Sequence, residues 1–160
     1  MRRGIAFLVS LVLAISLFSC SEPDVDMTYR HEYCELALNL PTSYTEGKSD
    51  SFDVIFTNGE AVVGIQRLSF QGVENDDLDG SMFPEKVARK YAEKNALEVE
   101  ITDKEDHSYF TYTDGAYYNL IAFYRSKYAH FIVRFMCIEE KENIYSADFL
   151  RFSSEAKFTQ

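Results

Sequence analysis

Two neighbouring segments in the second half of the chain, 116–124 and 129–138, are apolar on both of their alternating faces, and this restricts the possible folds more than any other feature. Successive residues of a strand point to opposite sides of the sheet, so a strand that is apolar at odd and even positions alike must be covered on both sides. Arg134 is the exception within the second segment. The simplest fold is α+β, an antiparallel sheet with helices on both faces.

Period-two alternation and turn residues predict the other strands of this sheet. The first of them ends at Pro41, which cannot donate a hydrogen bond within a sheet. Asn58-Gly59 and Asp114-Gly115 are hairpin signals, because the turns that they form need positive φ. The sequence predicts about six to seven strands in total. In addition to 116–126 and 129–138, the predicted strands are 34–40, 51–57, 60–70, 97–101 and 108–113.

Two segments have the spacing of apolar residues that is typical of helices packed on a sheet. Every fourth residue from Phe83 to Tyr91 is apolar, and Ser81 can cap a helix over 82–95. A second, shorter stripe of apolar residues predicts a C-terminal helix over 143–154. These are the two helices that could cover the two faces of the sheet.

The N-terminal segment has the pattern of an export signal. Arg2 and Arg3 precede an apolar run, 5–18, which is shorter than the roughly 20 residues that a bilayer-spanning helix needs. The sequence Leu-Phe-Ser-Cys that ends at Cys20 resembles the lipobox of bacterial lipoproteins, although Phe18 is larger than the residue usual at that site. The alternatives are an ordinary secretory signal and an uncleaved N-terminal anchor.

The lipoprotein resemblance implies cleavage before Cys20 and a diacylglyceryl thioether on its sulfur, usually with a further acyl chain such as palmitate on the new amine. Two or more acyl chains anchor a protein stably. We therefore expect a signal peptide over 1–19, a tether over 20–27 and a single α+β domain over 28–160. The expected location is the bacterial cell envelope, with the domain anchored by lipid to a membrane and facing either the periplasm or the cell surface.

The charge of the chain limits its partners. With 26 acidic against 16 basic residues, the formal charge is −10. An acidic surface argues against nucleic acid as a partner, and also against a domain that lies flat on anionic lipid. Contact with the membrane is expected through the lipid on Cys20 alone.

The order of the elements resembles the PsbP-like family. The matching features are an early strand that ends in Pro, over 36–41, a helix that includes 85–92, an Asp-Gly hairpin rich in aromatic residues, and the closing pattern Phe-Leu-Arg-Phe-Ser over 149–153. The resemblance implies an α-β-α sandwich. It also implies a function, because members of this family are mostly non-catalytic subunits that assemble or stabilise larger complexes. No site motif of the family can be matched to this sequence.

The sequence offers only weak candidates for a metal site. Asn75, Asp77 and Asp79, followed by Gly80, resemble the start of a calcium-binding loop, but Lys86 stands where the closing Glu should be. The acidic turn therefore fits better as the start of a helix. The three histidines, at 31, 107 and 130, lack the spacing of a zinc site and are expected at the surface or at strand edges. We predict no cofactor, and no motif of a catalytic nucleophile or phosphate-binding loop occurs.

Cys34 and Cys137 each share a face of their predicted strand with apolar residues, which predicts that they are buried neighbours in the core. Export would permit a disulfide between them, whereas free thiols are common at such apolar sites. The sequence leaves both possibilities open.

Tyrosines are concentrated around the Asp-Gly hairpin, and Tyr109, Tyr112 and Tyr117 are the candidates for contact with a partner. Tyr is also a good strand residue that packs well when half-buried. The sequence therefore favours a lipid-anchored, non-catalytic module of the cell envelope that binds or assembles a partner. That partner could be an envelope protein or a glycan. The alternative is a small envelope hydrolase that acts on glycan, peptidoglycan or lipid, which would need a cleft with converging acids or histidines.

Overall fold

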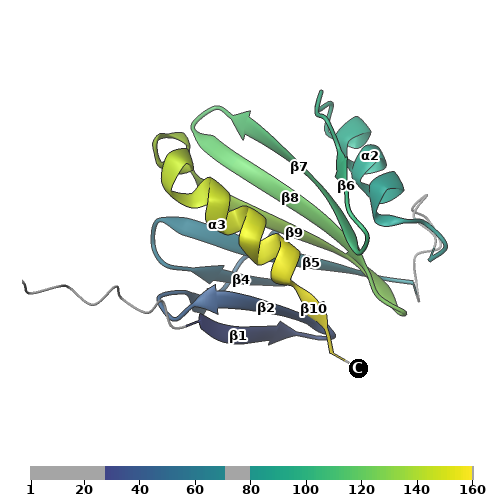
Figure 1. Cartoon of the computed structure of the whole chain (residues 1–160), viewed down its shortest axis with the longest axis horizontal. Helices are drawn as coiled ribbons and strands as arrows, with labels where there is room; N and C mark the ends of the chain where they lie inside the picture. Colours follow the sequence, from purple (N-terminus) through teal and green to yellow (C-terminus); the bar gives the residue numbers. More distant parts are fainter. Residues whose placement is uncertain (1–27, 71–79, 160) are drawn as a thin grey trace, which may run out of the picture.

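The fold is built on a seven-stranded antiparallel sheet, seen in a computed structural model that describes residues 28–70 and 80–159 (Figure 1). The strand order is β3-β4-β5-β9-β8-β7-β6, so the two segments with apolar residues on both faces, β8 and β9, lie side by side within the sheet. The strands are β3 (Thr45–Gly47), β4 (Val54–Thr57), β5 (Ala61–Ser69), β6 (Thr102–Asp103), β7 (His107–Asp114), β8 (Tyr117–Arg125) and β9 (Ala129–Ile138).

Two helices cover opposite faces of this sheet, which confirms the predicted α+β fold. The helix α2 (Pro84–Lys94) packs on one face, and α3 (Glu142–Glu155), which follows a short 3-10 turn η1 (Glu139–Lys141), packs on the other. The start of α2 differs from the prediction, because Phe83 and not Ser81 is its N-cap. Pro84 has the φ of a first helical residue and needs no hydrogen bond to its nitrogen, so the helix begins there.

A second, three-stranded sheet lies with α3 over the same face. It consists of β1 (Thr28–Tyr33), β2 (Leu36–Pro41) and β10 (Lys157–Phe158), with β2 in the centre. The sequence predicted one strand over 34–40. Instead β1 precedes a turn at Cys34, whose φ is 52°, and β2 returns antiparallel to β1.

The sheet separates two apolar cores. The larger lies between the main sheet, α3 and β2, and its largest fully buried side chains include Phe131, Phe135, Phe149 and Phe152. The smaller lies beneath α2, around Phe110, Ile121 and Phe123. The cores explain why β8 and β9 are apolar on both faces, since each strand contributes residues to both.

The predicted strand over 97–101 is absent, and only β6 pairs with β7 in this part of the chain. Leu97, Val99 and Ile101 are nevertheless half-buried against the core beneath α2. Their alternation therefore reflects an extended segment that packs one side on the core without backbone pairing. The Asp-Gly turn is also displaced by one residue, because Asp114 pairs with Tyr117 and the turn residues are Gly115 and Ala116.

The prediction that Cys34 and Cys137 are buried neighbours is wrong. Cys137 is buried on β9, but Cys34 is exposed at the turn between β1 and β2, and both are free thiols. The left-handed backbone conformation of Cys34 ends the alternation that the sequence suggested, so this side chain leaves the apolar face.

Candidate functional site

Among the residues that the structure describes, α2 covers only part of its face of the main sheet, and one end of that face is uncovered. The helix α2 contacts β6, β7 and β8, and it packs over the part of the face that holds Phe110, Ile121 and Phe123 (Figure 1). Farther along the strands, the cross-strand pairing places five more large apolar side chains on the same face. We call this group the open end. It consists of Val62, Tyr112, Tyr117, Met136 and Ile138.

The open end is accessible to a partner. Tyr117 and Ile138 are cross-strand neighbours whose exposed fractions are 46% and 40%. Met136 lies in the adjacent row between Val62 and Asn119, and it is half-buried like Val62. Aromatic residues and Met are enriched at protein interfaces, and contiguous exposed apolar side chains mark interaction sites. This arrangement is therefore suited to contact with another molecule.

Arg134 lies beside the open end and carries the positive charge on this part of the sheet. Its Nε donates a hydrogen bond of 2.9 Å to Oδ1 of Asn119, which is fully buried and donates through Nδ2 to the carbonyl of Tyr117. Burial raises the pKa of the Tyr112 phenol, and the charge of Arg134 partly offsets that rise. In the described part of the chain, Arg134 has no carboxylate within ion-pair distance.

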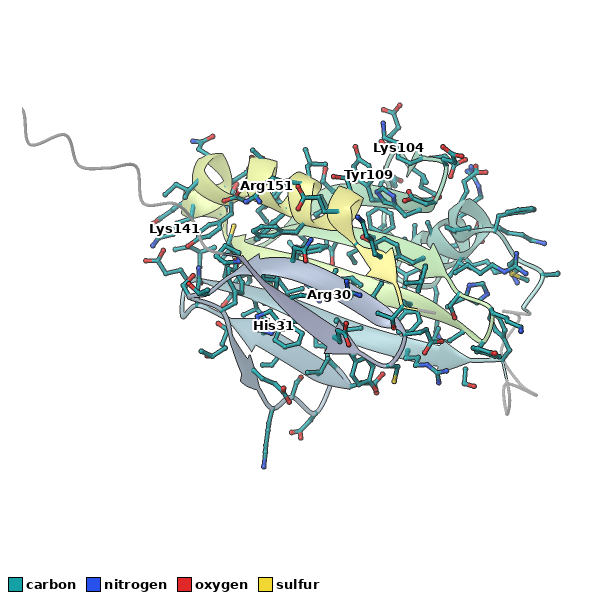
Figure 2. The ribbon with its side chains drawn as sticks, turned by 60° about the horizontal axis from the view of Figure 1, so that its bottom comes forward. Arg30, His31, Lys104, Tyr109, Lys141 and Arg151 are labelled. Carbon is teal, nitrogen blue, oxygen red and sulfur yellow. The ribbon has the colours of Figure 1, made fainter. Side chains whose placement is uncertain are left out.

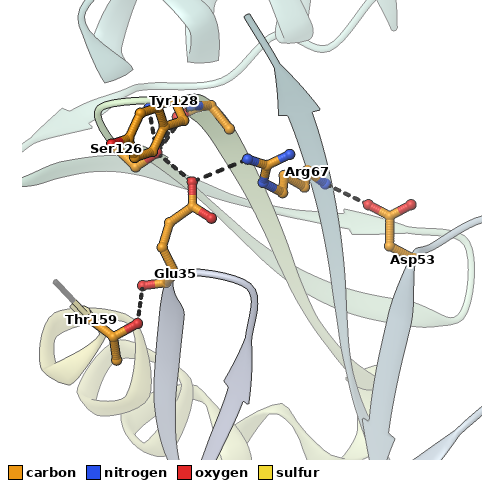
Figure 3. Close-up of polar contacts among 7 residues, drawn as sticks. Glu35, Asp53, Arg67, Ser126, Tyr128 and Thr159 are labelled. Atoms are coloured by element: carbon orange, nitrogen blue, oxygen red, sulfur yellow. Dashed lines mark hydrogen bonds and ion pairs between the residues drawn. The ribbon is translucent and has the colours of Figure 1, made fainter. Parts of the chain in front are cut away.

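A second arginine, Arg67, lies on the other face and has a different environment (Figure 3). Its Nη2 is 3.3 Å from Oε1 of Glu35, and the same oxygen accepts a hydrogen bond of 2.8 Å from Ser126. The backbone N–H of Arg67 donates to Asp53, and the carbonyl of Glu35 accepts from Thr159. This network joins the turn between β1 and β2 to the main sheet, so we interpret it as structural.

The protonation of Glu35 follows from these contacts. Burial by itself would raise the pKa of its carboxyl, but hydrogen bonds from Ser126, from its own backbone N–H and from Arg67 outweigh that effect. The pKa is therefore lowered below the ordinary glutamate value of 4.5. The charged pair is maintained at neutral pH.

An open hollow of about 990 Å³ lies between the β6–β7 hairpin and α3. Figure 2 shows Lys104 and Tyr109 beside the helix that carries Arg151. His107 also lines the hollow, although its exposed fraction is only 4%, and its Nδ1 is 2.7 Å from Oδ1 of Asp106. Its ring stacks between those of Tyr109 and Tyr124.

The chemistry available in this hollow is limited. A carboxylate at Nδ1 orients an imidazole in the way that a general base requires. The hydroxyls of Ser153 and Ser154, however, donate to carbonyls within α3, and neither is hydrogen-bonded to His107. The hollow thus contains an oriented histidine without an aligned serine nucleophile.

The candidate tyrosines lie on two sides of the molecule. Tyr109 faces the α3 side, where it packs on the larger core, whereas Tyr112 and Tyr117 belong to the open end. Strand geometry explains this separation, because residues three apart on β7 point to opposite faces. Sequence reasoning did not identify Arg134 as a site residue, although it noted Arg134 as the one charge within an apolar strand.

The remaining predictions concern the histidines, the lipidation site and the candidate metal ligands. His107 and His130 are buried, not at the surface as expected, because both lie within strands beneath aromatic rings. Cys20, Asn75, Asp77 and Asp79 lie outside the described residues. Over 28–70 and 80–159, no group of three or more His, Cys, Asp or Glu side chains could hold a metal ion, and no helix is long and apolar enough to span a membrane.

Comparison with known proteins finds the fold but no relative by sequence. No protein-family profile and no curated protein matches the chain. The solution structure of cyanobacterial PsbP (CyanoP) from Synechocystis sp. PCC 6803 superposes with a TM-score of 0.56 over 90% of this chain and 99% of that protein. The chain has a PsbP-like fold. The two sequences are 11% identical, so the PsbP-like likeness concerns the architecture and transfers no site residue.

Proposed function

We propose that the chain is a lipid-anchored module of the bacterial cell envelope that holds a partner and does not turn over a substrate. The observation that carries this proposal is the open end of the sheet, where Tyr117 and Ile138 are exposed beside the half-buried Tyr112, Val62 and Met136. A partner that covered these side chains would remove apolar surface from water, at about 25 cal/mol per Å². The PsbP-like fold agrees with such a function, since the family is composed mainly of accessory subunits.

The anchor is the second part of the proposal. A lipid on Cys20 would keep the domain at the membrane surface and raise the local concentration of membrane-bound partners. The formal charge of −10 would oppose adsorption of the domain to anionic lipid. The open end would then remain available to a partner in the envelope.

The proposal is tested by crosslinking in intact envelopes, followed by purification of the full chain. We expect Tyr112→Ala combined with Tyr117→Ala to lower recovery of the crosslinked partner at least about tenfold, since aromatic residues dominate interface energetics. Tyr128→Ala is the matched control, because Tyr128 is also exposed but lies on the β8–β9 turn. Undiminished recovery with the double variant, in a domain that melts normally, would disprove this use of the open end.

One observation favours the hydrolase alternative, namely the Asp106–His107 pair in the hollow beside α3. Under that alternative, the purified full chain would cleave peptidoglycan, a glycan ester or a lipid ester, and His107→Asn would abolish the cleavage. Turnover lost in this way, with binding of the partner unaffected by changes at the open end, would replace the binding proposal.

A further inference from the structure

We infer that Arg134 is the specificity-determining residue of the open end, where it binds a carboxylate in an extended, otherwise apolar peptide segment of the partner. This inference rests on the proposed function and deepens it by naming the chemistry of the partner. It follows from the environment of Arg134, from the shape of the surface around it and from the charge of the chain.

Arg134 differs from the other arginines that are not fully exposed. Arg67 has Glu35 as its ion-pair partner, and Arg151 has Asp148. Arg134 is half-buried as well, yet its hydrogen bond within the described chain goes to the neutral amide of Asn119. A guanidinium has five N–H donors in a planar fork that matches a carboxylate. The two Nη groups of Arg134 are therefore available to an external acid.

The guanidinium of Arg134 lies in an apolar environment. Its cross-strand neighbours are Gly64 and Ile121, and the ring of Phe52 lies over Gly64. The residues two positions away on the same face of β9 are Ile132 and Met136. A carboxylate bound here would be partly shielded from water, which strengthens a charge-assisted hydrogen bond relative to one at an exposed site.

Asn119 holds the guanidinium in place for such a ligand. Its amide is fixed at both ends, with Oδ1 accepting from Arg134 Nε and Nδ2 donating to the carbonyl of Tyr117. This fixed orientation reduces the rotamer entropy that Arg134 would otherwise lose on binding. The same amide connects the guanidinium to the strand that carries the exposed Tyr117.

The arrangement of side chains around Arg134 fits an extended peptide as the occupant. The open end presents rows of side chains across neighbouring strands, as Val62, Met136 and Tyr112 do in one row and Ile138 and Tyr117 do in the next. Successive rows are two residues apart along each strand, and the side chains on one face of an extended peptide repeat at the same two-residue interval. An anionic membrane surface is disfavoured because the chain itself carries a charge of −10. The same charge disfavours a run of acids, so a single acid between apolar residues fits best.

The test is a selection of random 12-residue peptides against the immobilised full chain in detergent, with the selected peptides sequenced. We expect the wild type to enrich peptides that carry one Asp or Glu between apolar residues. Replacement of that acid by its amide in a selected peptide should weaken binding at least about tenfold, the effect expected for a lost charge-assisted bond. This comparison uses the wild-type protein and does not depend on whether any variant folds.

Variants of the protein complete the test. Arg134→Gln should lose the preference for acidic peptides, and Arg134→Lys should retain the preference with weaker binding, because Lys keeps the charge but not the fork. Arg125→Gln is the matched control, since Arg125 is exposed at the far end of β8. Selected peptides without an acid, no selected peptides, or equal acid dependence in Arg134→Gln would overturn the inference.

The two proposals fail in different ways. If the tyrosine variants release the envelope partner but Arg134→Gln leaves it bound, the open end is the interface and the role of Arg134 is wrong. If the tyrosine variants retain the partner, the proposed function itself is wrong.

Discussion

Each face of the main sheet holds a half-buried arginine, but only one of these two arginines is paired with an acid in the described chain. On the α3 side, Arg67 of β5 lies beneath the turn of the small sheet and is paired with Glu35. On the α2 side, Arg134 of the neighbouring strand β9 lies beside the open end, and no carboxylate of the described chain forms an ion pair with it. The first face is closed by α3 and the small sheet, whereas the second is only partly closed by α2.

This difference separates residues that stabilise the domain from residues that are free to bind. An ion pair that joins two sheets is a structural feature, because both partners come from the same chain. A cation that the fold holds in place without an acid has a binding capacity that the fold does not use. We therefore expect residues on the α3 side to stabilise the domain, and we propose the open end on the α2 side as the surface that contacts a partner.

The largest expected effect is on the closed face. Phe149→Ala should lower the free energy of unfolding by about 3 to 5 kcal/mol, because the side chain of Phe149 on α3 is fully buried against the rings of Tyr118 and Phe135. Tyr117→Ala on the open end should cost under about 1 kcal/mol. Urea denaturation of both variants measures this contrast, and similar costs for the two would contradict the separation of the faces.

The two arginines should differ next. Arg67→Met removes the charge that faces Glu35, and because the pair is partly exposed we expect a loss of about 1 to 2 kcal/mol. Arg134→Met should change stability by under about 1 kcal/mol, since the bond to Asn119 is lost while a cation no longer has to be held on an apolar surface. Chemical denaturation at neutral pH distinguishes the two, and a greater loss for Arg134→Met would reverse the assignment.

The smallest expected effect is on how the stability of the domain changes as the pH falls. The pKa of Glu35 is lowered in the folded state, so its contribution to stability is present above the unfolded value of 4.5 and is lost as pH falls through the folded pKa. Glu35→Gln should therefore be less stable than the wild type at neutral pH and should lose less stability on acidification. Thermal melts across this acid range measure the difference in slope, and parallel curves would show that the Glu35 contacts do not set it.

The sequence was sufficient for the architecture because the strongest patterns were long. β9 begins and ends at the predicted residues, and α3 begins and ends within one residue of the prediction, since many apolar positions specified each. Shorter elements were missed. β10 has two residues, and the turn at Cys34 depends on a backbone conformation that no local pattern indicated.

The site was only partly predictable. Contact of Tyr112 and Tyr117 with a partner stays a prediction. The sequence grouped them with Tyr109, but residues three apart on a strand face opposite sides of the sheet. Arg134 was noted only as an interruption of an apolar pattern. The two arginines differ because an acid from a distant turn pairs with Arg67 and not with Arg134. That pairing arises only in the folded chain.

The most direct test of the comparison is site-specific photocrosslinking in living cells. A photoreactive residue is placed at Tyr117 on the open end, or at Leu150, which is also exposed but lies on α3. The account predicts a crosslinked partner from position 117, reduced at least about tenfold by Arg134→Gln, and no such product from position 150. The same partner captured from position 150 and not from 117 would contradict the assignment of the two faces.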